Sequence, residues 1–278
     1  MTASAERRVV LITGASSGIG LTCAEHLCRE GYRVYGASRS METVALPPSA
    51  RDLERLRMDV TNEASVQEAV RRILAAEGRI DVLINSVGYS LAGASAELSL
   101  DEMRAQFETN FFGYIRVTQA VLPVMRRQGS GRVVNVSSLA GLLGIPFQSI
   151  YSASKFAIEG WSEALRLELA GQNIQVVLVE PGDVKTGFTQ NRVLSRSANE
   201  ESPFREEMRR SLAVMEADER KGPGPEVIAR ILSRILRNRT PRLRYRAGDA
   251  FQCAAVGYRH WLPVGLFEWA LRRYYKLA

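Results

Sequence analysis

The sequence predicts a single α/β domain in which a parallel sheet is flanked by helices. Short β-branched and apolar segments alternate along the chain with longer segments of helical periodicity, which is typical of βαβ units. The chain has 278 residues, 46% of them hydrophobic, and shows no internal repeat, so we expect one sizeable core. No apolar run approaches the roughly 18 residues of a transmembrane helix, and the start of the chain does not read as a signal peptide.

The expected elements follow in chain order, with about seven parallel strands. Strands are predicted at residues 7–13, 32–38, 53–59, 80–85, 132–137, 174–180 and around 243–246. Helices are predicted at residues 19–30, 62–77, 99–128 and 151–170, and again after Gly224-Pro225. Ser99 and Glu102 form a capping-box pattern that opens the third helix, and Gly78 ends the second.

A glycine-rich turn joins the first strand to the first helix. The segment TGASSGIG contains Gly14, Gly18 and Gly20. Such a turn lets the backbone approach a pyrophosphate, and the helix N-terminus supplies N–H groups and a positive dipole. The GxxxGxG spacing differs from the more common GxGxxG, and a tight turn without a ligand is the alternative interpretation. Its place between a strand and a helix favours dinucleotide binding.

Tyr151 and Lys155 lie four residues apart at the start of a helical segment, thirteen residues after Ser138. Residues at this spacing share a helix face, so the ammonium can lie beside the phenol. A cation at about 4 Å, at an effective dielectric near 20, would lower the phenol pKa from about 10 to about 7. General acid–base catalysis works best near that pH. The pair is therefore a candidate catalytic site.

Together these motifs resemble those of the short-chain dehydrogenase/reductase family, and the resemblance covers nearly the whole chain. The stretch NVSSLAGLLGIPFQSIYSASKFAIEGWSEAL looks closest to the branch of 17β-hydroxysteroid and retinol dehydrogenases. The resemblance implies a doubly wound Rossmann fold and a catalytic tetrad of Asn110, Ser138, Tyr151 and Lys155. It also implies cofactor contacts at Gly14, Ser16, Ser17, Gly18, Ile19, Gly20, Asp59, Val60, Asn85, Gly88, Tyr151, Lys155, Pro181, Gly182, Val184 and Thr186.

The mechanism that the resemblance implies is hydride transfer between a nicotinamide and a carbonyl or alcohol carbon. Tyr151 would exchange the proton with the substrate oxygen, and Lys155 would lower the phenol pKa and hold the nicotinamide ribose. Ser138 would hydrogen-bond the carbonyl oxygen. Asn110 would anchor a water that feeds protons to Lys155. One motif departs from the family, since its NNAG stretch reads NSVG at residues 85–88 here.

The second strand predicts which cofactor is used. It ends in Ser38-Arg39-Ser40, with no acidic residue before Glu42. An acidic residue at this point bonds the ribose 2′-hydroxyl of NAD, whereas an Arg accommodates the 2′-phosphate of NADP. Arg39 is placed to bind that phosphate, with Ser17 as a second contact, although a solvated Arg is the alternative. We therefore expect NADP(H).

The excess positive charge lies at the end of the chain. Residues 230–278 hold 11 basic and 2 acidic residues, whereas the whole chain has a net charge of +7. We expect residues 1–250 to form the Rossmann-type catalytic domain, with 184–221 as a polar, irregular substrate lid, and 251–278 to form a basic amphipathic extension. A helix after Pro263 carries Val264, Phe267, Leu271 and Tyr274 on one face. It can dock on the core or over the cleft, the interpretation we favour, or lie on an anionic membrane.

The substrate is expected to be a small hydrophobic ketone or alcohol of the steroid, retinoid or long-chain type. The pocket would be walled by Leu139, Leu142, Leu143, Ile145, Pro146 and Phe147. Reduction of a 3-oxoacyl thioester is an alternative, as is a catalytically silent NADP-binding sensor or scaffold. No nucleic-acid motif accompanies the charge.

The few cysteines and histidines of the chain limit its capacity to bind metal and indicate its cellular location. Three Cys and two His show no metal-binding spacing, so no metal and a reduced, cytoplasmic location are expected. In the family, the long helix from Ser99 and the helix of Tyr151 commonly pair across a two-fold axis. A homodimer or homotetramer is therefore expected.

Overall fold

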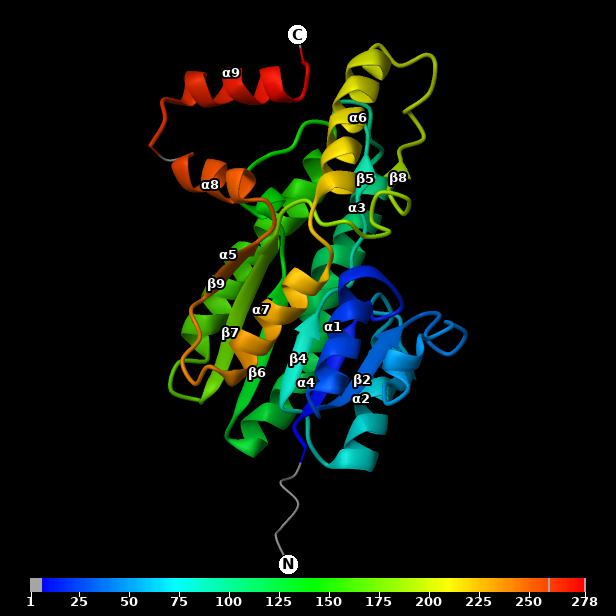
Figure 1. The fold of residues 1–278 in the computed structure, drawn as a ribbon. Coiled ribbons are helices and arrows are strands. Elements are labelled where there is room, and N and C mark those ends of the chain that lie inside the picture. Colours follow the sequence, from blue (N-terminus) through cyan, green and yellow to red (C-terminus); the bar gives the residue numbers. More distant parts are fainter. Residues whose placement is uncertain (1–6, 260, 278) are drawn as a thin grey trace, which may run out of the picture.

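The centre of the fold is a seven-stranded sheet in which all neighbouring strands are parallel (Figure 1). The computed structural model describes residues 7–259 and 261–277. The strand order is β3-β2-β1-β4-β6-β7-β9. The strands are β1 Val9–Thr13, β2 Arg33–Ser38, β3 Glu54–Arg57, β4 Val82–Asn85, β6 Gly131–Val136, β7 Ile174–Pro181 and β9 Arg244–Ala247. The order reverses between β1 and β4, and ligands of such sheets bind outside the carboxyl ends of the strands at that point.

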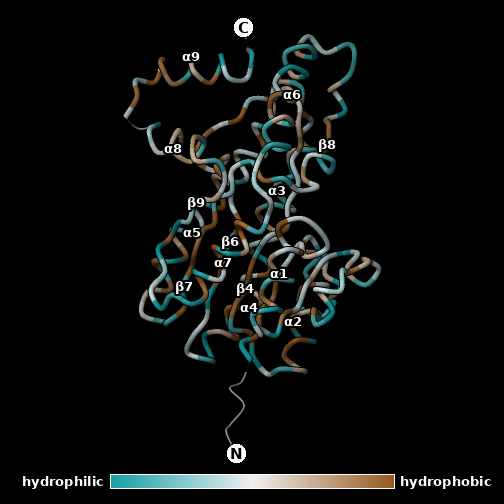
Figure 2. The backbone as a smooth tube through the Cα atoms, in the orientation of Figure 1, coloured by the Kyte–Doolittle hydropathy of each residue, from teal (hydrophilic) through white to brown (hydrophobic). Residues whose placement is uncertain are grey.

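The central strands are buried on both faces, which explains why they read as continuous apolar runs rather than alternating ones. Every residue of β1 and β4 is buried. In β1, Val10 and Ile12 face one layer of helices, and Val9 and Leu11 face the other. Figure 2 shows the hydrophobic colouring along the central strands.

Helices cover both faces of the sheet. One layer consists of α1 Gly18–Arg29 and α7 Glu226–Arg237, which pack against the core that holds Val10 and Ile12. The other consists of α2 Glu63–Glu77, α4 Gly113–Gln128 and α5 Ser149–Glu168. The predicted α/β class, parallel sheet and flanking helices are thus confirmed.

The sequence signals for helix ends are confirmed, but one predicted helix is not regular. Gly78 ends α2 in the left-handed conformation, with φ of 69°. Ser99 and Glu102 form a reciprocal capping box at the start of α3 Leu100–Phe107. The helix expected over residues 99–128 is interrupted by a π-helical segment, η2 Glu108–Phe112, before α4 begins. Such segments are frequently found at functional sites.

Three helices gather beyond the carboxyl edge of the sheet, namely α6 Arg205–Lys221, α8 Ala250–Tyr258 and α9 Val264–Tyr274 (Figure 1). The prediction of an irregular segment over 184–221 was wrong in its second half, because α6 is a regular helix. Its Met208, Leu212 and Met215 recur at helical spacing and pack against Tyr275. The helix α8 was not expected from the sequence; Asp249 caps it by accepting from two backbone N–H groups.

Smaller elements complete this region. A two-stranded parallel sheet pairs β5 Leu91–Ala92 with β8 Val193–Leu194. Two short 3-10 turns occur, at η1 Pro48–Ala50 and η3 Leu139–Gly141. Among the described residues, no helix combines the length and apolarity needed to cross a membrane.

Candidate active site

A cavity of about 850 Å³ lies at the carboxyl edge of the sheet. Its wall runs from the glycine-rich turn after β1, past the ends of the neighbouring strands, to the inner side of α9. Nearly all the residues expected to act in catalysis or to bind the cofactor line this one space. The two exceptions are Asn85 and Asn110, which do not belong to the described wall.

The glycine turn is built so that the backbone lies close to anything bound there. Gly14 has φ of 72°, in the left-handed region that favours glycine. A Cβ on Gly20 would lie 2.2 Å from the carbonyl oxygen of Gly14, so no side chain fits where α1 packs on the turn. Ser17 precedes α1 but its side chain makes no capping hydrogen bond. The free N-terminus of α1 and this hydroxyl are therefore suited to a pyrophosphate.

The end of β2 presents polar groups to the same cavity. Ser38, Arg39 and Ser40 line it, together with Ser16 and Ser17 of the glycine turn. The Ser38 hydroxyl is buried and has no hydrogen-bond partner among the described atoms. Buried polar groups are normally satisfied, so an unpartnered hydroxyl beside a guanidinium fits a site for an anionic group.

Asn85 is placed behind the cavity wall rather than in it. Its side chain is fully buried at the end of β4, where Nδ2 donates to Thr118 Oγ1 at 3.1 Å and to Asn135 Oδ1 at 2.9 Å. The wall beside it is formed by Ser86, Val87 and Gly88. The side chain of Asn85 therefore ties β4 to β6 and to α4, and its expected contact with the cofactor stays a prediction.

Asn110 is also buried, inside the π-helical segment η2. Its Oδ1 accepts from the Tyr89 backbone N–H at 3.1 Å, and its Nδ2 donates to the Tyr89 carbonyl at 2.9 Å. Tyr89 itself lines the cavity. The side chain of Asn110 thus fixes the loop after β4, and its expected part in a proton relay stays a prediction.

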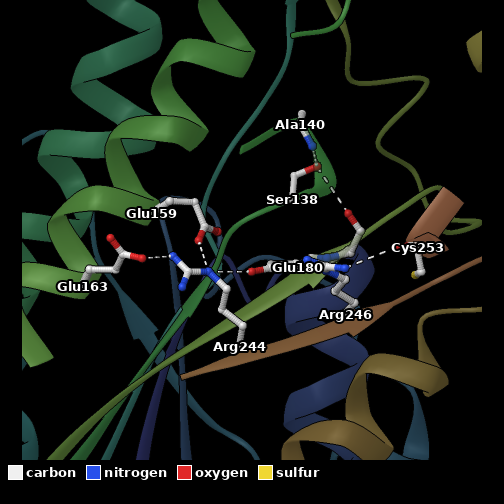
Figure 3. Close-up of polar contacts among 9 residues, drawn as sticks. Ser138, Ala140, Glu159, Glu163, Glu180, Arg244, Arg246 and Cys253 are labelled. Carbon is white, nitrogen blue, oxygen red and sulfur yellow. Dashed lines mark hydrogen bonds and ion pairs between the residues drawn. The ribbon is translucent and has the colours of Figure 1, made fainter. Parts of the chain in front are cut away.

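Ser138, Tyr151 and Lys155 meet in the middle of the cavity wall. Ser138 follows β6, and its Oγ accepts from the Ala140 N–H at 3.1 Å and donates to the Pro181 carbonyl at 3.3 Å (Figure 3). The same hydroxyl hydrogen-bonds the Tyr151 phenol, which by itself lowers the pKa of that phenol. Tyr151 and Lys155 share the buried face of α5. The Lys155 ammonium donates to the Val136 carbonyl at 2.9 Å and lies 5.8 Å from the centre of the Tyr151 ring.

The expected lowering of the phenol pKa by Lys155 is not found. Burial raises the pKa of Tyr151 to about 12, and the Ser138 hydrogen bond only partly opposes this. Burial also lowers the pKa of Lys155 to about 8, against the charge of Glu159, which raises it. Because both groups are desolvated, the charged form of each is disfavoured. The phenol is therefore protonated at neutral pH and is ready to donate.

A buried ionic network lies beneath Ser138 (Figure 3). Glu159 follows Lys155 by one helical turn, and Glu180 directly precedes Pro181. The Arg244 guanidinium lies 2.9 Å from Glu159 Oε2 and 3.0 Å from Glu180 Oε1, and Arg246 lies 3.2 Å from Glu180 Oε2. These four side chains join α5, β7 and β9 close to Ser138 and Lys155.

The remaining wall is largely apolar. Of the residues expected to form the substrate pocket, Leu139, Leu143 and Ile145 line the cavity and the other three do not. Sequence reasoning missed the side chains that α6 and α8 contribute, whereas the apolar face predicted after Pro263 does reach the cavity. From α6 to the end of α9 and the turn after it, the wall includes Met215, Phe251, Ala254, Ala255, Leu262, Phe267, Ala270, Leu271, Tyr274 and Tyr275. Gln148 and Phe188 also line the cavity.

The parallel sheet, the glycine turn at a helix N-terminus and the buried Ser–Tyr–Lys group define a nicotinamide-dependent oxidoreductase of the Rossmann type. Residues 8–197 match the model of the short chain dehydrogenase family. The chain belongs to that family, and it is an oxidoreductase that interconverts alcohol and carbonyl groups.

Curated relatives cover nearly the whole chain. It is 41% identical to the 3-ketodihydrosphingosine reductase of Bacteroides thetaiotaomicron, over 97% of this chain and 98% of that protein. It is 36% identical to retinol dehydrogenase 8 of Bos taurus, over 88% and 82% of the two chains. It is also 36% identical to the human 17-beta-hydroxysteroid dehydrogenase type 1, over 88% and 79%. The resemblance to the hydroxysteroid and retinol branch is thus confirmed.

Solved structures agree with this assignment. A short-chain dehydrogenase from Streptomyces avermitilis superimposes with a TM-score of 0.82, at 34% identity over 96% of this chain and 97% of that one. A short-chain dehydrogenase/reductase from Burkholderia phymatum in complex with NAD gives a TM-score of 0.79, at 29% identity over 92% and 93%. The family binds a nicotinamide cofactor, and the cavity described above fits one.

Proposed function

We propose that the protein is an NADP(H)-dependent reductase of a long-chain hydrophobic ketone, and that it oxidises the corresponding secondary alcohol in reverse. The observation that carries this proposal is the apolar wall that continues from Tyr151 to α9 along one cavity. A cavity of about 850 Å³ is large enough for the nicotinamide end of a dinucleotide together with the apolar chain of a substrate. The Bacteroides relative, named for reduction of a ketodihydrosphingosine, supports a long-chain substrate.

The chemistry that a bound nicotinamide would supply is hydride transfer to the carbonyl carbon. Tyr151 donates its phenolic proton to the oxygen, because its raised pKa keeps it protonated at neutral pH. Ser138, which already hydrogen-bonds the phenol, orients the same oxygen. Lys155 stabilises the phenolate that forms, and the buried wall excludes water from it. The glycine turn, Asp59, Val60 and the segment 181–186 hold the cofactor.

The choice of NADP(H) is proposed from Arg39, supported by Ser17 and the unpartnered hydroxyl of Ser38. Replacing Arg39 by Ala removes the guanidinium that would pair with the 2′-phosphate. We expect Arg39→Ala to raise the dissociation constant for NADPH about tenfold to a hundredfold, since a charge-assisted hydrogen bond contributes about 1.5–3 kcal/mol. The dissociation constant for NADH should stay nearly constant. Fluorescence titration of the reduced nicotinamide measures both, and equal losses for the two cofactors would contradict the proposal.

The substrate proposal is tested by following the dihydronicotinamide absorbance with NADPH. The panel holds long-chain ketones, a steroid ketone, a retinoid aldehyde and a carrier-bound 3-oxoacyl thioester. We expect the highest kcat/KM with long-chain ketones. Turnover confined to the thioester would favour the alternative that the sequence left open, and binding of NADPH without turnover of any carbonyl would favour a silent sensor or scaffold.

We also propose that the protein is cytoplasmic and binds membranes peripherally through α8 and α9. The inner side of this pair closes the cavity, while its outer side exposes Trp261 (84%) and Trp269 (62%). Arg272 and Arg273 are exposed in the last turn of α9. Interfacial Trp residues beside basic ones suit an anionic lipid surface. Both interpretations of the predicted C-terminal helix are therefore combined, one on each side of it.

We expect Arg272→Ala/Arg273→Ala to weaken binding to phosphatidylglycerol vesicles by tenfold or more, because each basic residue near such a surface contributes about 1 kcal/mol. Vesicle co-sedimentation measures the effect. The matched control is Arg126→Ala/Arg127→Ala, an exposed basic pair at the end of α4. Binding that is equal for the two double variants, or no binding by the unaltered protein, would refute the membrane proposal.

A homodimer or homotetramer is proposed from the exposed apolar side chains of α4 and α5. Phe112 precedes α4 and is 47% exposed, and Phe156 and Leu167 on α5 are 41% and 76% exposed. Exposed apolar groups on two neighbouring helices suit a two-fold interface. The molecular mass in solution decides between monomer, dimer and tetramer.

A further inference from the structure

The wall of the substrate cavity is not apolar throughout, because three carboxylates interrupt it on one side. Asp183 follows β7 directly after Gly182, and Asp218 and Glu219 lie in the last turn of α6. All three line the same cavity as Tyr151. The charges of Glu219 and Asp183 raise the pKa of the Tyr151 phenol, so they act at the place where the ketone oxygen is protonated.

The partners of these carboxylates leave much of their charge uncompensated. Arg192, whose side chain is 3% exposed, lies 2.5 Å from Glu219 Oε1 and 3.6 Å from Glu216. The other described partners are neutral donors: the Thr189 hydroxyl to Glu219, the Tyr274 hydroxyl to Asp218 at 2.6 Å, and the Gln252 amide to Asp183. Of the three carboxylates on the cavity wall, only Glu219 therefore has a guanidinium among its described hydrogen-bond and ion-pair partners, and that guanidinium is shared with Glu216.

This charge is costly beside an apolar ligand. Burial, together with the charges of Glu219 and Asp218, raises the pKa of Asp183 to about 6, although the Gln252 hydrogen bond and the Arg192 charge lower it. A wholly apolar ketone would cover these groups and remove their remaining hydration without replacing it. A cationic substituent would pair with them instead. The wall thus selects against a purely hydrocarbon substrate at this end.

A second feature also points to a polar ligand at this end. Gln148 lies three residues before Tyr151, is only 4% exposed, and lines the cavity. Among the described residues, its Nε2 donates a hydrogen bond to the Met215 sulfur at 3.1 Å. A thioether is a weak acceptor, so the amide of a buried Gln is left without a good partner. Met215 lies one turn before Asp218 and Glu219 on α6, so this amide and the carboxylates lie on neighbouring parts of the wall.

We propose that Asp183, Asp218 and Glu219 bind an ammonium group that the substrate carries close to its ketone, and that Gln148 bonds a polar group beside it. The inference rests on the proposed function and narrows it to amino ketones with a long apolar chain. Asp183 is the main specificity-determining residue, because it lies within the segment expected to hold the cofactor and its charge acts on the Tyr151 phenol. The long apolar chain of the substrate would run along α8 and α9, whose side chains form the apolar part of the wall.

The test compares two ketones that differ only in the amino group, 2-aminooctadecan-3-one and octadecan-3-one, each with NADPH. We expect the unaltered protein to prefer the amino ketone in kcat/KM by about tenfold to a hundredfold, the range of a charge-assisted hydrogen bond. Asp183→Asn, which keeps the size of the side chain, should reduce this ratio at least tenfold. Asp101→Asn, at an exposed carboxylate of α3, is the matched control and should leave the ratio as it is.

The ratio separates recognition from general damage, since a structural defect lowers both activities together. Glu219→Gln provides a second variant should Asp183→Asn fail to fold. Equal kcat/KM for the two ketones with the unaltered protein would overturn this inference and leave the proposed function standing. A ratio unchanged in both variants would also overturn it. Turnover of neither ketone would overturn the proposed function and this inference with it.

Discussion

Replacing Tyr151 by Phe should lower kcat for ketone reduction by about a hundredfold to ten-thousandfold, the usual contribution of a positioned general acid. The substitution removes one oxygen, the phenolic group that the Ser138 hydroxyl holds in the cavity wall. The ring remains, with its contact to Phe188 at 5.7 Å between centroids. We therefore expect the dissociation constant for NADPH to change little while turnover is lost.

Single-turnover kinetics with saturating NADPH measure this loss at the chemical step. Tyr32→Phe is the matched control, because Tyr32 directly precedes β2 and does not belong to the described cavity wall. It should retain normal activity. If Tyr151→Phe retained more than a tenth of the turnover, another group would have to deliver the proton, and the assignment of Tyr151 would be wrong.

Replacing Arg244 by Ala should reduce the free energy of unfolding by about 3–5 kcal/mol, the usual cost of removing one partner of a buried ion pair. Arg244 bridges Glu159 and Glu180, whose side chains are 6% and 0% exposed (Figure 3). Without it, no described cation lies within 4.0 Å of the Glu159 carboxylate, and Glu180 retains only Arg246. Urea unfolding at neutral pH measures the change.

The control for Arg244 is a surface pair of similar geometry. Arg237 lies 2.6 Å from Glu30, but its side chain is 69% exposed. Exposed pairs contribute about 0–1 kcal/mol, so Arg237→Ala should cost less than about 1 kcal/mol. Equal losses in the two variants would show that burial does not govern the network.

The pH dependence of the same network has a definite sign. Burial and the Glu159 charge raise the pKa of Glu180 from 4.5 to about 7. The folded protein therefore binds more protons than the unfolded chain in this range, and the contribution of Glu180 to stability is lost as the pH rises through about 7. Relative to Glu180→Gln, the unaltered protein should become less stable as the pH rises from about 5 to 8. A difference that does not vary with pH would contradict the raised pKa.

Local signals in the sequence were sufficient for most of the fold. Glycine at a left-handed position, as at Gly78, and a side chain that caps a helix, as at Ser99, act within a few residues. The apolar runs of the central strands likewise report burial on both faces. The same kind of signal failed for α6, because its polar composition hides an apolar stripe of Met208, Leu212 and Met215.

The site shows the same division between local and long-range causes. The spacing of Tyr151 and Lys155 on one helix places them together, which the sequence could predict. Their pKa values depend on desolvation by segments distant in sequence, and this reversed the expected direction for Tyr151. The side-chain directions of Asn85 and Asn110 also depend on partners far along the chain, Asn135 and Tyr89.

The sequence by itself therefore determined the α/β class, the chain order of the seven sheet strands, the glycine turn and the spacing that brings Tyr151 and Lys155 together on one helix. These follow from periodicity, backbone freedom and fixed spacing, which are properties of short segments. Only the tertiary structure decided which side chains reach the cavity, how α8 and α9 close it, and that Asp183 meets Asp218 and Glu219 beside Tyr151. Such tertiary contacts join residues far apart in the chain, and the burial and charge around each residue depend on the packing of the whole domain.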